Sequence, residues 1–436
     1  MATSDVEVGG GDSILRSVKF LLDCKEKGRN HGNRRPPSIF IVPRVYRDLS
    51  PTCFNPRLVS IGPLHRKDKD LQKFEVQKMT YLHHLLDHSG SNPEQTLQEC
   101  VQKVILKIEQ IKSCYEETTY NDEELATMMV IDACFILYFI HLISVEAGGF
   151  QGNWSIIPLI VHDMVLIENQ IPFFVLKDII ESTFPHFKPN TSLTHHLKIL
   201  LERYSFFMEY EVTNNINLDK TPDHILGILH YCLQPVHHPL PYSEVPMEQK
   251  RHSAMELDRA GVNFMPNEDA NWAMAMKLEL PRFSCFPWFW CKPTLRMPKL
   301  YVDDYTELLL RNLILYEQCT LVPEYVTSYC WAIDMLVDTP EDVAKLIKSG
   351  VLVNDCGSNE SAVYILNNIC NDITSDVFYY YQEWERLDTY YKSYWPNAAA
   401  GLKRTYFSSP WNIISVFAAI ILFVLTLIQT IFTFKC

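Results

Sequence analysis

The sequence predicts a mainly α-helical (α+β) protein: a multi-helix globular domain with a small antiparallel sheet, plus one C-terminal transmembrane helix. Three observations lead to this prediction. Apolar residues recur at helical spacing over most of the chain. One shorter region alternates apolar and polar residues between prolines, as strands do. Finally, Ile413 to Phe434 is an uncharged apolar run of 22 residues, which is long enough to cross a bilayer.

Composition narrows the class of protein. With 436 residues and 47% hydrophobic residues, the chain suits a globular fold with a large core and not a disordered one. Its formal net charge of -13 disfavours nucleic-acid binding, because phosphate contacts need a basic surface. The 13 cysteines are scattered without a Cys-x-x-Cys pair, so we expect reduced thiols in a cytosolic domain. The first residues resemble no secretory signal, and no motif predicts a cofactor or a metal.

Changes in composition suggest four segments. Residues 1–37, rich in glycine and arginine, are expected to form a flexible tail around a short helical run from Ile14 to Leu22. Residues 38–402 form the helical domain, which a proline-rich loop at 235–250 divides into two lobes in one interpretation. Residues 403–412 are the juxtamembrane segment, and residues 413–434 are the transmembrane helix.

The helical domain is expected to pack around the stretch Asp163–Leu176. Three adjacent polar residues, Glu168, Asn169 and Gln170, interrupt its apolar run. Burying polar side chains is costly unless each finds a hydrogen-bonding partner. Pro172 disfavours helix at the residue before it and suits the first turn of a new helix. The stretch therefore predicts a helix, a polar break and a second helix.

Two further helices carry polar residues inside apolar runs. Met128 to Val145 is long enough to begin a membrane span, but Asp132 inside it would be costly in lipid. We therefore predict a buried core helix in which Asp132 has a partner. The helix predicted from Asp303, a good N-cap residue, to Gln318 embeds three polar side chains: Asn312, Glu317 and Gln318.

The remaining elements follow from periodicity and from turn residues. Extended segments are expected at 38–46 and 58–65, and helical apolar faces at 71–86 and 97–115. Further helices are expected at 193–210, 222–233 and 378–395. Thr339-Pro-Glu-Asp342 predicts a capped helix that ends at Gly350. A helix that ends at Gly261 is expected to lead into an extended segment, and the antiparallel sheet is placed at 272–302.

Several residues admit both a functional and a structural interpretation. His65, beside Gly62-Pro63, is either a catalytic or ligand histidine or, as we favour, one bonded to a neighbouring carbonyl. His84 and His88 lie four residues apart, but no third metal ligand accompanies them. The proline-rich loop and the aromatic run Phe286 to Trp290 are candidate partner surfaces. The aromatic run equally suits a satellite core over the sheet.

The C-terminal run has the features of a membrane anchor. Pro410 begins it, and Trp411 suits a membrane interface. Lys403 and Arg404 precede the run and one lysine follows it, a two-to-one bias that favours a cytosolic domain. The expected partners are therefore the lipid bilayer, through Ile413 to Phe434, and a protein.

Taken together, the motifs resemble a plant family known as domain of unknown function 247. The resemblance covers residues 38–436, with small departures at Leu64, where the family often has an aromatic residue, and at Ala133, where it often has glycine. The Glu-Asn-Gln-x-Pro motif at residues 168–172 is the most specific part. The other matching stretches are Ile41-Val-Pro-Arg44, Val59–His65, Met128–Phe135, Asp163–Leu176, Glu256–Phe264, Arg311–Cys319 and Pro410-Trp411.

The resemblance implies a land-plant membrane protein without an established activity. Because some grass members are linked to self-incompatibility, it also implies a recognition or signalling role. We accordingly favour a tail-anchored, single-pass protein at the plasma membrane or an endomembrane, acting as an interaction module. The alternative is a membrane-tethered enzyme in which the buried carboxylates of Glu168 and Glu317 act with His65. No phosphate-binding loop or nucleophile elbow identifies a substrate.

Overall fold

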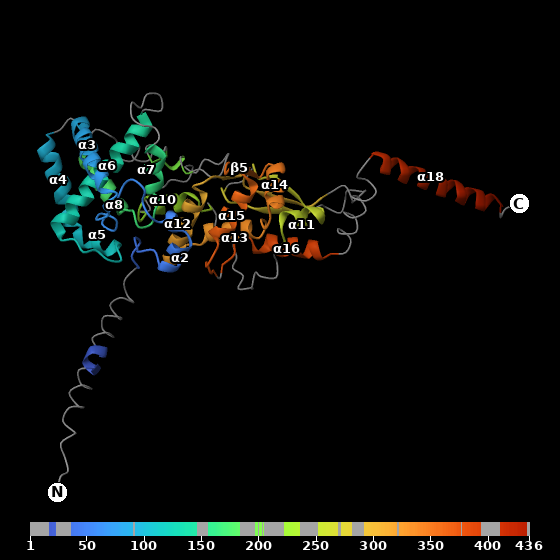
Figure 1. Ribbon diagram of the computed structural model, residues 1–436, viewed down its shortest axis with the longest axis horizontal. Helices are drawn as coiled ribbons and strands as arrows, with labels where there is room; N and C mark the ends of the chain where they lie inside the picture. The colour runs from blue at the N-terminus through green and yellow to red at the C-terminus, as the bar shows by residue number, and fades with distance from the viewer. Residues whose placement is uncertain are drawn as a thin grey trace, which may run out of the picture.

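The computed structural model describes residues 17–22, 36–89, 92–145, 156–183, 197–198, 200–202, 204, 222–235, 252–268, 272–280, 292–320, 322–375, 377–393 and 410–433. The fold is mainly helical with small sheets, as predicted. Helices α3 to α8 gather at one end of the body, and α11 and α13 to α16 at the other, with α10 and α12 between them (Figure 1).

Helix α6 (Asp122–Val145) forms the centre of the first half. It packs against α3 (Gln72–Ser89), α4 (Pro93–Leu106) and α8 (Phe173–Thr183), and its side chains from Met128 to Ile140 are buried. In the part of the chain that the structure describes, this is the one helix long and apolar enough to cross a membrane. Its burial by three other helices confirms the prediction of a core helix.

The second apolar face is split between two helices. One helix was expected to cover residues 97–115, but α4 ends at Leu106 and α5 (Ile108–Cys114) starts anew after Lys107. Lys107 leaves the helical conformation with φ -110° and ψ 12°. Its ammonium reaches across to Asp178 of α8 at 2.6 Å, so the break coincides with an ion pair between α4 and α8.

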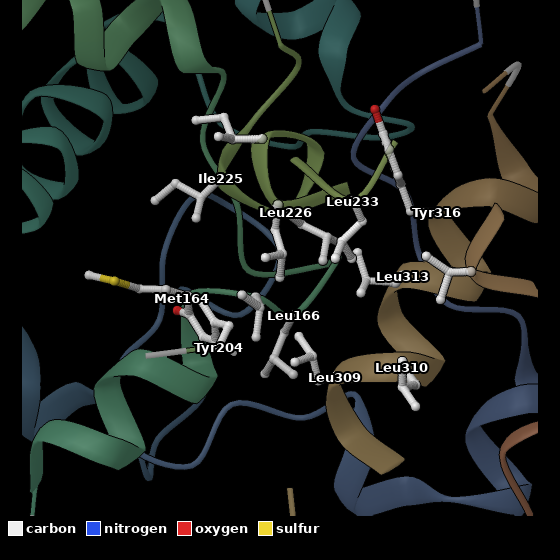
Figure 2. Packing of buried hydrophobic residues seen from close by; sticks show 14 of the residues in the cluster. Met164, Leu166, Tyr204, Ile225, Leu226, Leu233, Leu309, Leu310, Leu313 and Tyr316 are labelled. Carbon is white, nitrogen blue, oxygen red and sulfur yellow. The ribbon is translucent and has the colours of Figure 1, made fainter. Parts of the chain in front are cut away.

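The predicted helix, break and helix are confirmed around Glu168. Helix α7 (Ile157–Asp163) ends at Asp163, residues 164–172 form the polar break, and α8 begins at Phe173 after Pro172. Every residue of the break is buried. Its apolar side chains pack between α10 (Ile225–Cys232) and α12 (Thr306–Cys319), and Figure 2 shows Met164 and Leu166 among the leucines of those two helices.

The second half consists of short helices. These are α11 (Ala254–Arg259), α13 (Tyr325–Asp334), α14 (Pro340–Lys348), α15 (Asn359–Ile369) and α16 (Tyr381–Lys392). A capping box between Thr339 and Asp342 opens α14, as predicted, and Gly350 follows it with φ 74°. The N-cap of α12 is Tyr305, two residues after the predicted Asp303, because the Asp303 carboxylate accepts the Tyr305 N–H and the Thr306 hydroxyl before the first turn.

The sheet prediction is only partly correct. Strand β2 (Lys277–Glu279) pairs antiparallel with β3 (Thr294–Met297), but β1 (Asn263–Pro266) lies parallel to β3 on its other side. Beyond it, β4 (Leu300–Val302) pairs in parallel with the distant β5 (Leu352–Asn354). The alternating pattern identified strands but not their partners, because β1 and β5 lie outside the region that showed it.

Residues 38–66 wrap the first half as an N-terminal strap. The expected extended segment 38–46 is wrong from Arg44 onward, because α2 (Arg44–Leu49) begins after Pro43, followed by the short 3-10 turn η1 (Pro51–Cys53). Ile39 makes an isolated parallel bridge with Tyr115. Residues 58–65 are irregular and pair with no strand, so their backbone groups need other partners.

Helix α18 (Pro410–Thr433) stands apart from this body in Figure 1. Its described side chains, Ile414, Ser415 and residues 417–430, are exposed. Its apolar stretch in that described part, Phe417–Thr430, is shorter than a span. The predicted loop at 235–250, apart from residue 235, and the aromatic run at 286–290 lie outside the described residues. So do most of the helix expected at 193–210 and the segment 403–409.

We expect Gly62→Ala to destabilise the fold more than Gly357→Ala does. Both glycines have positive φ, of 74° and 80°, so each alanine pays a conformational cost of about 1–2 kcal/mol. At Gly62 the new Cβ would also lie 2.5 Å from the Gln170 carbonyl oxygen, whereas at Gly357 nothing lies within 4 Å. Urea unfolding of the two variants should differ by about 1–3 kcal/mol. Equal losses would show that the strap does not press closely on the break.

Candidate functional site

Asp163, the last residue of α7, binds the strap at residues 57–59. Its two carboxylate oxygens accept the backbone N–H groups of Arg57, Leu58 and Val59 at 2.8–2.9 Å. The residue is almost completely buried. Burial raises the pKa of Asp163 above its ordinary value, and the three N–H donors act in the opposite direction. Three consecutive amides of an irregular segment are thereby satisfied by one side chain.

Asn169 continues this row of bonds into the polar break. Its side-chain oxygen accepts the Ile61 N–H at 2.6 Å, and its NH₂ group donates to the carbonyls of Val59 and Asp163 at 2.9 Å. Its side-chain amide thus accepts from one residue of the strap and donates to another, as the backbone of a neighbouring strand would in a sheet. The Asn169 side chain that makes these bonds is fully buried.

Gln170 fixes the conformation of the break itself. Its NH₂ group donates to the carbonyls of Met164 and Leu166 at 2.6 and 2.9 Å. Its own backbone carbonyl accepts the Tyr115 hydroxyl at 3.0 Å. The side chain therefore closes the loop from Met164 to Gln170, which belongs to no helix or strand, and this accounts for a polar residue at this buried position.

Asp132 of α6 meets the strap from the opposite side. One of its oxygens accepts the Gly62 N–H at 2.8 Å, and the other lies 2.6 Å from the ammonium of Lys78 on α3. Both side chains of this ion pair are fully buried. Lys78 also donates to the Ser60 carbonyl and contacts Glu75. Because a buried charge is costly without a partner, Asp132 and Lys78 depend on each other and on the strap.

Glu168 joins three separate parts of the strap. One oxygen accepts the Val42 N–H and the Arg47 guanidinium, and the other lies 2.7 Å from Nε2 of His65. Burial opposes ionisation of this carboxyl, but the bonds from His65, Arg47 and Val42 outweigh it and lower the pKa of Glu168. The carboxylate is thus held ionised at neutral pH and occupied on both oxygens.

The polar residues of α12 divide between two places. Asn312 donates to the Cys53 carbonyl and accepts the Ile167 N–H at 2.9 Å, so it connects the strap with the break. Glu317 accepts from Nε2 of His230 and from the N–H groups of Val326 and Thr327, each at 2.8 Å. It lies in a different cluster, between α10 and the start of α13.

The remaining predicted site residues are Gln318, Trp411, Lys403 and Arg404. Gln318 is half-buried, and its side-chain nitrogen has no hydrogen-bond partner among the described residues. Trp411 belongs to α18, but its side chain, like all of Lys403 and Arg404, lies outside the described residues. The membrane-interface assignment of these three residues therefore stays a prediction.

Sequence reasoning missed Lys78, Arg47 and His224, and the carbonyl partner favoured for His65 is wrong because its Nε2 meets the Glu168 carboxylate. Lys78 belongs to the helical stretch predicted at 71–86, and nothing in its spacing identifies it as the partner of Asp132. His224 was also missed: it accepts the Gly227 N–H and lies 3.0 Å from the Ser38 carbonyl. Burial lowers the pKa of His224 to about 4, so it stays neutral at the N-terminus of α10.

The geometry of Glu168, Glu317 and His65 suits a structural role more than a catalytic one. Glu168 and His65 do touch, as the enzyme alternative requires, but Glu317 pairs with His230 instead of joining them. Both carboxylates are nearly inaccessible and accept several protein donors each. No group of three or more His, Cys, Asp or Glu side chains within the described ranges is arranged to hold a metal ion. The bonded side chains thus hold parts of the fold together: Glu168 joins the strap to the break, and Glu317 joins α10 to α13.

We expect Glu168→Ala and Glu168→Gln to lower the free energy of unfolding at pH 7, by about 1–3 kcal/mol, because Arg47 and His65 lose a buried partner. The folded pKa lies below the ordinary value of 4.5, so the contribution is complete above pH 4.5. It disappears as pH falls through the folded pKa. Urea unfolding across pH 3–7 should show the gap between parent and Glu168→Gln closing on acidification. The exposed Glu360→Gln serves as a control, and a gap independent of pH would contradict this role.

Comparisons with known proteins match a region that includes the strap, the break and most of α18. The family model described as a plant protein of unknown function matches residues 39–425, from the strap into α18. The chain is 25% identical over 418 residues to UPF0481 protein At3g47200 of Arabidopsis thaliana, covering 90% of this chain and 85% of the relative.

It is also 23% identical over 487 residues to the putative UPF0481 protein At3g02645 of the same plant, covering 90% and 89%. No solved structure matches. Because the family model spans nearly the whole length, the chain belongs to the plant family of unknown function DUF247.

Proposed function

We propose that this plant protein is a single-pass membrane protein held by α18, and that its helical domain is a protein-interaction module with a recognition or signalling role. One observation carries the first part: α18 is a helix without a charged residue whose described side chains are all exposed. The second part rests on the sealed polar core and on the family, for which no activity is established.

The exposure of α18 argues for a bilayer around it. Its large apolar side chains from Ile414 to Ile428 are 44–65% exposed. A valine, leucine, isoleucine or phenylalanine gains about 1.5–3 kcal/mol on leaving water, so these ten residues would not stay hydrated. The helix also lacks lysine and arginine, which an amphipathic helix lying in the plane of a membrane carries on its polar face. A spanning helix satisfies both features.

The bonding of the polar core weighs against the enzyme alternative. A catalytic carboxylate must reach a substrate. The oxygens of Glu168 and Glu317 instead accept hydrogen bonds from backbone and side-chain donors within the fold. Buried thiols are no better placed as nucleophiles, since burial raises the pKa of Cys53 and Cys232 to about 12. The domain therefore acts most simply through its surface.

Removal of residues 411–436 should release the protein from membranes and leave a folded domain. The reason is that no described side chain of α18 belongs to the core. Fractionation after a high-salt wash and a thermal melt of the released protein would test both parts, with the full chain as the control. A truncated protein that still sediments with membranes would contradict the anchor.

The domain should face the cytosol, in keeping with its buried free thiols at Cys53, Cys100 and Cys134. Three acceptor sequons report on this topology: Asn153-Trp-Ser, Asn190-Thr-Ser and Asn359-Glu-Ser. We expect none to be glycosylated in plant cells. A matched fusion with an added secretory signal would show whether the same sites accept a glycan in the lumen. A shift of the native protein that an N-glycosidase removes would reverse the topology.

A further inference from the structure

Helix α2 of the strap carries an apolar patch on its outer side. Val45 and Leu49 lie four residues apart, so they share one side of the helix, and they are 53% and 40% exposed. Arg47 lies on the opposite side, where its guanidinium bonds to Glu168. Ile41, just before the helix, is exposed as well, and no residue of α2 is buried. We call Ile41, Val45 and Leu49 the α2 patch.

Residues 17–22 form a short helix whose apolar side chains are also exposed. Val18, Phe20, Leu21 and Leu22 are 49–67% exposed, and the helix, drawn in blue, lies apart from the body in Figure 1. Val18, Leu21 and Leu22 are spaced by three and four residues and therefore share one side. Apolar side chains are driven out of water wherever a second apolar surface is within reach. We call residues 17–22 the N-terminal helix.

The connection between these two apolar surfaces is short. Residues 23–35 join the N-terminal helix to Pro36, where the strap side of the described chain begins, shortly before Ile41. Even fully extended, this connection reaches only roughly 45 Å. A tether of that length gives an effective concentration on the order of 1 mM. A contact too weak to hold a separate molecule would therefore form within the chain.

The charges on the two sides are complementary. Residues 23–35 contain five lysines or arginines against two acidic residues, and Lys19 adds a positive charge to the helix, although the whole chain has a net charge of -13. Beside the α2 patch, Glu116 and Glu117 are exposed, and the Glu116 carboxylate accepts the Ile41 N–H at 2.9 Å. Opposite charges favour encounter and help to fix the orientation of a contact.

We propose that the N-terminal helix docks on the α2 patch of its own chain, with Val18, Leu21 and Leu22 against Val45 and Leu49. This docking does not depend on α18 crossing a bilayer. It covers the exposed side of α2 with a segment that is always close to it. A protein partner that binds the α2 patch must first displace the N-terminal helix, which makes the helix a built-in competitor for that surface.

Hydrogen exchange of the full chain in the presence of phosphatidylcholine nanodiscs tests the docking. The amides of residues 18–22 should exchange about tenfold more slowly than in a free peptide of residues 12–27, as a contact of about 0.1 mM affinity gives at this effective concentration. Val45→Asp together with Leu49→Asp should abolish that protection and leave exchange in α6 unchanged. Val76→Asp is the matched control, since Val76 is an exposed apolar residue of α3, and it should keep the protection.

A variant in the tail keeps the test decisive if the double variant disturbs α6. Leu21→Asp lies outside the helical domain, and it should speed exchange at residues 45–49 as much as deletion of residues 1–22 does. Exchange at residues 18–22 that equals that of the free peptide overturns the proposal, as does protection that survives loss of the patch. Protection that requires phosphatidylserine in the nanodiscs also overturns it, because the N-terminal helix would then bind an anionic membrane.

Discussion

The fold depends on side chains that act as hydrogen-bond partners for a backbone without secondary structure. Between Arg57 and Gly62 the strap belongs to no helix or sheet, and it is buried from Val59 to Gly62. Asp163, Asn169 and Asp132 accept five of its N–H groups. A buried amide left without a partner costs about 1–3 kcal/mol, so the strap, the break and α6 are stable only together.

This dependence explains the concentration of charge in an otherwise apolar core. Lys78 neutralises Asp132, while Arg47 and His65 meet Glu168, so these two buried carboxylates are paired with side chains from α3 or from the strap. Replacing such a pair with apolar residues is often tolerated, whereas removing one partner is not. The network therefore fixes the position of the strap more than it adds net stability. In this account, the proposed functions belong to the surface of the domain and to α18.

Elements with strong periodicity or strong boundary residues could be predicted from the sequence. The break before Pro172 and the capped start of α14 are set by neighbouring residues, and both were predicted correctly. The polar residues of the core were identified because they interrupt apolar runs. Their partners were not, because Asp132 and Lys78 are 54 residues apart and no local pattern encodes that contact. The parallel pairing of β4 with β5 was missed for the same reason.

Hydrogen exchange of the full chain tests the central role of these side chains most directly. If Asp163, Asn169 and Asp132 hold the strap, the amide hydrogens of Leu58, Val59, Ile61 and Gly62 should exchange as slowly as those of α6, because they are released only when the first half unfolds. Exchange as fast as that of the exposed turn at residues 67–70 would contradict the account. It would show that the strap opens without disturbing the core.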